Sequence, residues 1–208
     1  MKRFTIVLAL LFIFQLNAQR DEAYVDNLLA EFTAKLEERS IFSWFSVKRY
    51  CTGSVEMFQM EDGSWCSSKG TYFETYVVWV EEDGTTMIKK LDNCGLFYSI
   101  PLKSNDLSKF VNDNIYDFTA NSVRNYQAEN ITGTPEQRTS IHSCKRSYVF
   151  KRKGSISKST YNLYDLTTSE EHPNVHYEYN NSLKIVELDQ KMDEVFESLQ
   201  PKFRRQKQ

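Results

Sequence analysis

The spacing of the apolar residues changes at about residue 40, and this change constrains the fold more than any other feature of the chain. Residues 21–39 repeat apolar side chains at three- and four-residue steps, with acidic residues in the first turn and Arg39 in the last. This pattern predicts an amphipathic helix. From Ile41 to Pro101, β-branched and aromatic residues dominate and turn signals recur, which is typical of antiparallel strands. The two patterns together predict an α+β fold, with the N-terminal helix packed on a curved, mostly antiparallel sheet.

The clearest hairpin surrounds Asp83-Gly84. Residues 72–80 and 85–91 on either side of it are rich in strand-forming residues, and Asp-Gly suits the left-handed positions of a tight turn. Helical spacing of apolar residues then returns over residues 105–118, and Ser104 is in a position to cap this second helix.

The C-terminal half mixes the two patterns. The run Thr134-Pro135-Glu136-Gln137 has the spacing of a capping box and predicts a short helical turn. Residues 143–150 and 157–166 have the composition of two more strands. Apolar residues at helical steps predict a helix over residues 185–199, although a strand through Leu188 followed by a shorter helix is an alternative.

The first 18 residues have the three-part layout of a secretory signal peptide. Lys2 and Arg3 form a positive start, an apolar run of about 13 residues follows, and Ala18 offers a small residue at the cleavage position. A membrane anchor is the alternative, but this run is shorter than the roughly 20 residues that a helix needs to span a bilayer. We expect residues 1–18 to be removed. No later segment is long and apolar enough to cross a membrane, and no repeat or long linker divides residues 19–208, so we expect these to form a single α+β domain.

The end of the leader, Asn-Ala-Gln, is similar to the leaders of exported proteins from Bacteroidetes-type bacteria. This resemblance implies a location in the periplasm or outside the cell. Four cysteines follow in the mature chain, and an even number of cysteines in an exported protein favours disulfides because such compartments are oxidising. Three pairings are possible, and the sequence does not choose among them. The candidates are Cys51, Cys66, Cys94 and Cys144.

Composition excludes several classes of protein. With 40% hydrophobic residues and only 7 glycines and 4 prolines among 208 residues, the chain is not disordered, collagen-like or of low complexity. Removal of Lys2 and Arg3 leaves 24 basic against 28 acidic side chains, a formal charge of −4. Together with export, this charge argues against nucleic acid as a partner.

The histidines offer one candidate metal site, at His172 and His176. Their spacing matches that of helical zinc ligands, but Pro173 interrupts a helix, and on an extended strand the two rings would lie roughly 13 Å apart. His142 lies two residues before Cys144, yet an oxidising compartment makes a disulfide cysteine the better interpretation than a nucleophile. No serine-hydrolase or phosphate-loop motif is present, so no catalytic residue and no cofactor is expected.

A basic segment between residues 144 and 161 is the most distinctive candidate for binding. It contains six positive side chains, no acidic ones and three interleaved aromatic residues, a composition that favours anionic ligands. The alternative is a solvated hairpin whose charges are balanced by acidic residues elsewhere. The six are Lys145, Arg146, Lys151, Arg152, Lys153 and Lys158.

These features favour an exported, non-catalytic binding protein of the bacterial envelope or the extracellular space. Its partner would be an acidic glycan, a lipid or an envelope protein. Two alternatives stay open. One is an extracytoplasmic hydrolase, possibly metal-dependent, and the other is a periplasmic inhibitor or immunity-type protein.

Overall fold

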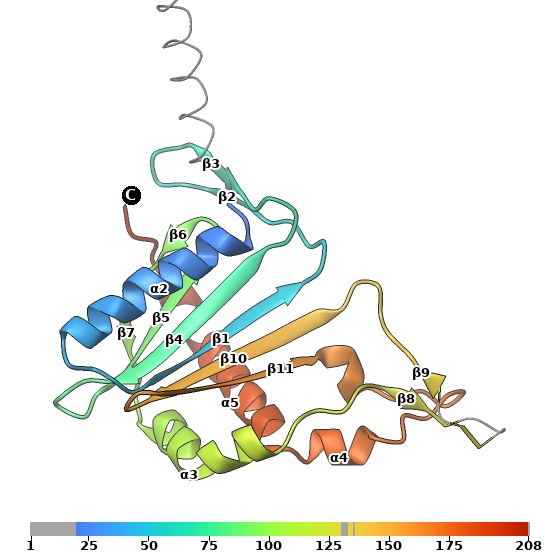
Figure 1. The fold of residues 1–208 in the computed structure, drawn as a ribbon. Helices are drawn as coiled ribbons and strands as arrows, with labels where there is room; N and C mark the ends of the chain where they lie inside the picture. The colour runs from blue at the N-terminus through green and yellow to red at the C-terminus, as the bar shows by residue number, and fades with distance from the viewer. Residues whose placement is uncertain (1–19, 130–132, 135, 208) are drawn as a thin grey trace, which may run out of the picture.

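The computed structural model describes residues 20–129, 133–134 and 136–207, and its centre is a seven-stranded antiparallel sheet. The strand order is β11-β10-β1-β4-β5-β6, and β7 pairs with β5 (Figure 1). The strands are β1 (Trp44–Cys51), β4 (Phe73–Val80), β5 (Thr86–Asp92), β6 (Gly95–Leu96), β7 (Ile100–Pro101), β10 (Cys144–Arg152) and β11 (Ser155–Asn162). The expected α+β class, with a mostly antiparallel sheet, is confirmed.

One face of the sheet is covered over β4, β5 and β6 by α2 (Glu22–Glu38). The side chain of Asp21 caps this helix by accepting a backbone N–H from its first turn. Val25 and Leu36 of α2 are buried in a cluster with the strand residue Trp79, whose ring meets that of Phe32 edge-on. The amphipathic pattern of residues 21–39 therefore forms the expected helix and buries its apolar stripe.

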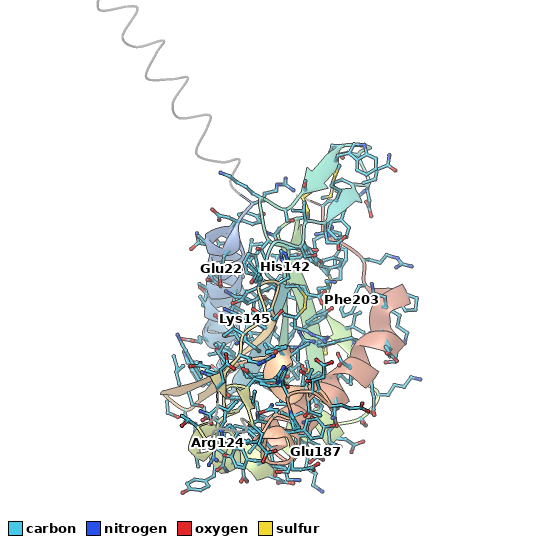
Figure 2. The ribbon with its side chains drawn as sticks, turned by 90° about the vertical axis from the view of Figure 1, so that its right-hand side faces the viewer. Glu22, Arg124, His142, Lys145, Glu187 and Phe203 are labelled. Atoms are coloured by element: carbon cyan, nitrogen blue, oxygen red, sulfur yellow. A yellow bond between two sulfur atoms is a disulfide. The ribbon has the colours of Figure 1, made fainter. Side chains whose placement is uncertain are left out.

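The opposite face is covered by α3 (Asp106–Ala120) and α5 (Lys184–Leu199). The ring of Phe196 in α5 stacks on Tyr76 of β4, with 3.8 Å between the ring centroids. Figure 2 shows the layers edge-on, with Glu22 of α2 on one side and Phe203, just beyond α5, on the other. The molecule thus has three layers over the centre of the sheet.

A buried polar cluster also joins α5 to the sheet. Asp189 of α5 accepts hydrogen bonds from Arg146 Nε at 3.0 Å and from the hydroxyl of Tyr148 at 2.9 Å. Burial raises the pKa of the Tyr148 hydroxyl well above its ordinary value, so it stays a donor. Because Arg146 and Asp189 are both almost fully buried, each depends on the other for its charge balance.

The remaining elements are short and lie at the ends of the sheet (Figure 1). β2 and β3 form a two-stranded ribbon, and β8 and β9 form another. Their bounds, with those of the short helices, are β2 (Met57–Gln59), β3 (Trp65–Ser67), β8 (Gln127–Ala128), β9 (Glu136–Gln137), η1 (Leu163–Leu166), α4 (Tyr177–Asn181) and η2 (Gln200–Lys202).

Most predicted elements are confirmed with shifts of one or two residues at their ends. The hairpin around Asp83-Gly84 is β4–β5, and the helix predicted over residues 105–118 is α3. The helix predicted over residues 185–199 is α5, so the alternative of a strand through Leu188 is wrong. Leu188 and the other apolar residues at helical spacing in α5 are buried in the core, which is the pattern of one apolar face of a helix.

Three local predictions are wrong. Asn105, not Ser104, precedes the first turn of α3, and Ser104 instead donates its hydroxyl to Asp106. Glu136 and Gln137 form strand β9 rather than a helical turn, because they pair with β8. Residues 163–166 form η1 rather than the end of a strand.

The signal peptide predicted for residues 1–18 lies outside the described residues. No helix in the described part of the chain is long and apolar enough to cross a membrane.

Candidate functional site

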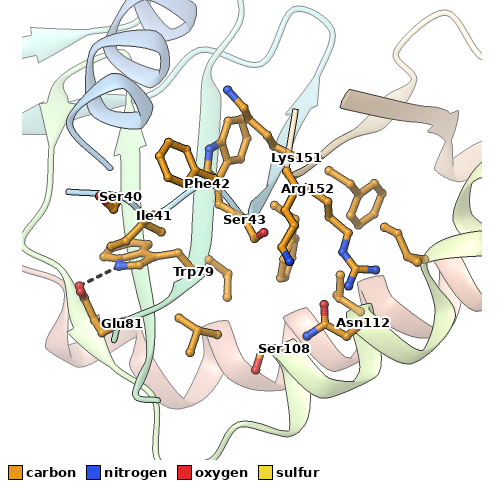
Figure 3. Close-up of a pocket in the computed structure, with 18 of the residues that line it drawn as sticks. Ser40, Ile41, Phe42, Ser43, Trp79, Glu81, Ser108, Asn112, Lys151 and Arg152 are labelled. Atoms are coloured by element: carbon orange, nitrogen blue, oxygen red, sulfur yellow. Dashed lines mark hydrogen bonds between the residues drawn. The ribbon is translucent and has the colours of Figure 1, made fainter. Parts of the chain in front are cut away.

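A cavity of about 540 Å³ lies at the end of the sheet where β1 begins (Figure 3). Two hairpin turns flank it, the one between β4 and β5 and the one between β10 and β11, and α3 forms its far wall. Cavities of this size are typical of small-molecule sites. The lining residues that carry the argument are Ser40, Phe42, Phe45, Val78, Val111, Ile115, Phe150, Lys151, Arg152 and Lys153.

One wall of the cavity is formed by the segment that follows α2. Ser40 adopts a left-handed conformation (φ 63°), and the backbone N–H of Ile41 donates to the carbonyl of Leu36. This is a Schellman-type helix stop, in which Ile41 packs back on Leu36 in the core. The reversal leaves the next residue, Phe42, at the cavity with 51% of its surface exposed.

A second wall is formed by the two-residue turn between β10 and β11. Lys153 (φ 38°) and Gly154 (φ 91°) join β10 to β11, and both have positive φ, as a type I′ hairpin turn requires. Lysine rarely adopts this conformation. Among the described residues, Ser40 and Lys153 are the only non-glycine positions with positive φ, and both line this cavity. Backbone strain of this kind concentrates at functional sites.

The interior of the cavity is apolar. Side chains alternate between the two faces of a strand, so a single row of residues from each strand faces this interior. Phe45 of β1 pairs in register with Val78 of β4 and with Phe150 of β10, so all three project toward α3. Val111 and Ile115 of α3 face them across the cavity. The interior is therefore lined by aliphatic and aromatic groups.

Polar groups sit at the edges of this interior. Ser108 and Asn112 of α3 and Ser43 before β1 line the cavity (Figure 3). Arg152 continues the strand row of Phe150, so its side chain lies on the side of α3, as Asn112 does. A charged group thus stands at the margin of an apolar space.

Ion pairs hold both hairpin turns to the end of α2. Lys151 is paired with Glu37, and Arg39 donates to Glu81 at 2.5 Å. Glu81 also accepts from the indole N–H of Trp79 at 2.8 Å (Figure 3). The hydrogen bond from Arg39 lowers the pKa of the Glu81 carboxyl, so this anchor stays charged at neutral pH.

Arg152 and Lys153 differ from Lys151 in having no acidic partner. Both are exposed at the turn, and neither makes an ion pair with any residue that the structure describes. Glu82 lines the other hairpin turn of the cavity. The turn between β10 and β11 therefore presents two unneutralised positive charges beside an apolar interior.

The structure separates the six basic residues that the sequence singled out. Lys151, Arg152 and Lys153 line the cavity. Arg146 is buried against Asp189 on the side of α5 and is not available to a ligand. Lys145 and Lys158 are not among the residues that line the cavity, and their strand positions place them on the other face of the sheet.

The two histidines of the candidate metal site do not belong to a cluster of metal-ligating side chains among the described residues. His176 shares a hydrogen bond with Gln127 at 3.0 Å between Nε2 and Oε1, and His172 lies in the loop before α4. Within the described ranges, no group of three or more histidine, cysteine, aspartate or glutamate side chains is arranged to hold a metal ion.

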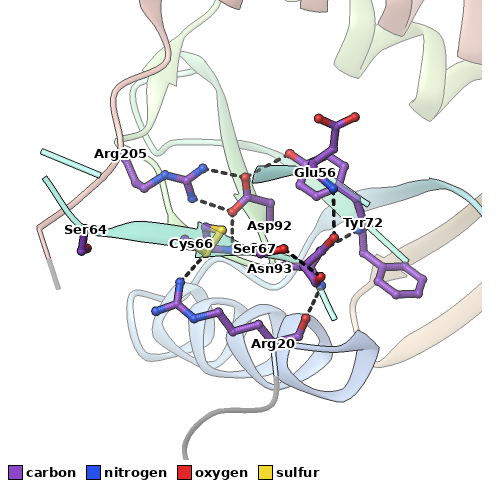
Figure 4. Close-up of a disulfide and its surroundings, with 12 residues drawn as sticks. Arg20, Glu56, Ser64, Cys66, Ser67, Tyr72, Asp92, Asn93 and Arg205 are labelled. Atoms are coloured by element: carbon purple, nitrogen blue, oxygen red, sulfur yellow. Dashed lines mark hydrogen bonds and ion pairs between the residues drawn. A yellow bond between two sulfur atoms is a disulfide. The ribbon is translucent and has the colours of Figure 1, made fainter. Parts of the chain in front are cut away.

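All four cysteines form disulfides, Cys51 with Cys144 and Cys66 with Cys94. Cys144 therefore has no thiol to act as a nucleophile beside His142. Cys51 and Cys144 are direct cross-strand partners at the end of the β1–β10 ladder. Figure 4 shows the second disulfide, which holds the β2–β3 ribbon beside Asp92 and Arg205.

Sequence reasoning missed the part of the site outside the basic segment. Ser40, Phe42 and the α3 residue Ile115 come from segments far apart in the chain. Phe42 lies where the hydrophobic spacing changes, but only the structure shows that its ring is exposed at the cavity.

Comparisons with protein family models, with curated proteins and with solved structures found no match to this chain.

Proposed function

We propose that this protein is an exported, non-catalytic binding protein whose ligand is anionic and occupies the cavity between the two hairpin turns. The observation that carries the proposal is the pairing of an apolar interior with Arg152 and Lys153, two cations without an acidic partner among the described residues. Ligand sites commonly combine an apolar lining with a few placed charges.

Two further features support the proposal. The Glu37–Lys151 and Arg39–Glu81 pairs connect both hairpins to the end of α2 at the walls of the cavity. The strained positions Ser40 and Lys153 both border the cavity. Non-glycine residues in this backbone conformation cluster at functional sites.

Export rests on the predicted leader and is supported by the two disulfides, which persist in oxidising compartments. The hydrolase and inhibitor alternatives from the sequence have no comparable support. Neither a metal-ligand cluster nor a recognisable nucleophile adds weight to the hydrolase within the described residues.

The test is isothermal titration of the oxidised protein with two anionic probes at low salt, decanoate and tri-galacturonic acid. The variant Arg152→Glu/Lys153→Glu should weaken binding by about tenfold or more, which corresponds to roughly 1.4 kcal/mol. The matched control Lys145→Glu/Lys158→Glu makes the same change in net charge at two other positions of this hairpin, outside the cavity. It should bind as the parent protein does. Absence of binding to both probes, or an equal loss in both variants, would contradict the proposal.

A further inference from the structure

The proposed function leaves open the chemistry of the ligand, and the lining of the cavity narrows it. We infer that the ligand is a single-chain anionic amphiphile, with an aliphatic body inside the cavity and one acidic head group at Arg152 and Lys153. This inference rests on the proposed function and specifies its ligand.

The interior favours an aliphatic body over a sugar. The innermost lining is almost fully buried and has no hydrogen-bonding side chain, and Ser43, Ser108 and Asn112 stand only at its edge. The innermost residues are Phe45, Val78 and Phe150 on the sheet and Val111 on α3, with the half-buried Ile115 beside them. A sugar placed among them would bury several hydroxyl groups without partners, and each such group carries a desolvation penalty. A hydrocarbon chain carries no such groups and gains from the same burial.

The charges define the other end of the ligand. Arg152 is the last residue of β10 and Lys153 the first residue of the turn, so both charges lie at one side of the cavity, where they attract a head group rather than a charge distributed along a polymer.

The size of the site favours a free amphiphile over a membrane surface. The cavity between the two hairpin turns and α3 holds about 540 Å³, a volume that suits a single alkyl chain. Glu82, on the rim opposite the cations, would oppose approach to a uniformly anionic membrane.

The experiment is a titration series on the oxidised protein with hexanoate, octanoate and decanoate, with decanol and decyltrimethylammonium as matched neutral and cationic probes. Each added methylene should tighten binding by about two- to fourfold. Decanoate should bind at least tenfold more tightly than decyltrimethylammonium. Binding that is independent of chain length, or a preference for the cationic probe, would overturn the inference.

Two variants of α3 locate the chain. Ile115→Gln places an amide in the cavity wall and should weaken decanoate binding severalfold, whereas Tyr116→Gln changes the adjacent, 77% exposed residue and should not. Thermal unfolding of both variants checks that they fold. An equal effect of the two variants would overturn the placement of the chain in the cavity.

Two other probes separate the failure of this inference from the failure of the proposed function. If tri-galacturonic acid binds and the alkyl carboxylates do not, the ligand class is wrong while an anion site remains. If phosphatidylglycerol vesicles bind the protein through Arg152 and Lys153 while free decanoate does not, the assignment to a soluble amphiphile is wrong. If no anionic probe binds, both proposals fail.

Discussion

Arg205, three residues from the C-terminus, makes a two-point ion pair with Asp92 of β5, with nitrogen–oxygen distances of 2.5 and 2.8 Å. The carboxylate of Asp92 is fully buried, and it also accepts from the hydroxyl of Tyr72 and the backbone N–H of Cys94 (Figure 4). The C-terminal segment is thereby fastened to the sheet, at the end away from the cavity.

Loss of Arg205 should destabilise the protein strongly. Arg205→Met removes the only cation paired with Asp92 among the described residues and leaves a buried charge, a change that typically costs about 3–5 kcal/mol. The neighbouring Arg204→Met removes an exposed arginine and should change stability by less than about 0.5 kcal/mol. Urea denaturation of both variants measures the difference. Similar midpoints would show that the pair contributes little.

The two disulfides should contribute unequally. Cys51–Cys144 closes a span of 93 residues and Cys66–Cys94 a span of 28. On chain entropy alone, their removal should cost about 4–5 and about 3–4 kcal/mol respectively. Double alanine variants, compared by urea denaturation, test this order. The reverse order would mean that packing of the β2–β3 ribbon at Cys94 outweighs loop entropy.

Spacing predicted those elements whose side chains face the core. The helices α2 and α5 and the β4–β5 hairpin follow directly from apolar periodicity, because burial imposes the period of 3.6 or 2 on the sequence. Ser104 is not the cap because α3 begins at Asp106, after Asn105, and the side chain of Asn105 accepts hydrogen bonds from Thr86 of β5. That contact is tertiary, and local sequence carries no record of it.

The candidate site was only partly predictable for a related reason. The basic segment was visible, but Arg146 and Arg152 differ in role although they lie on the same face of β10. Arg146 meets Asp189 of α5, which is 43 residues away, whereas Arg152 lines the cavity beside α3. Only the packing of α5 on the sheet distinguishes a structural cation from a free one.

Stability should rise with pH between about 8 and 10 because of Lys89. Burial, together with the nearby charge of Lys35, lowers the pKa of this lysine to about 8 from an ordinary 10.5. In this interval the unfolded chain holds the proton and the folded chain does not, so the free energy of unfolding increases as pH rises. Urea denaturation at pH 7.5, 8.5 and 9.5 should show the rise, and Lys89→Met should flatten it. The exposed control Lys103→Met should keep the profile of the parent protein.

Above pH 10 the buried tyrosines should reverse this trend. Burial raises the pKa of Tyr72, Tyr76, Tyr148 and Tyr161 above their ordinary value of 10. The unfolded chain then releases phenolic protons that the folded chain retains, so folding loses stability as pH rises past 10. Absorbance at 295 nm should therefore show these four of the 12 tyrosines ionising only as the protein unfolds. Ionisation of all 12 in the folded state would contradict the burial.

Relief of strain at the cavity should separate stability from binding. Ser40→Gly and Lys153→Asn each replace a left-handed residue with one that tolerates positive φ, and each should stabilise the protein by about 0.5–1 kcal/mol. Ser40→Gly keeps both cations and should bind decanoate as the parent protein does. Lys153→Asn removes one cation and should bind severalfold more weakly despite its greater stability. Denaturation and titration of the same two variants measure both effects, and a Lys153→Asn protein that is more stable and binds equally well would exclude Lys153 from the ligand site.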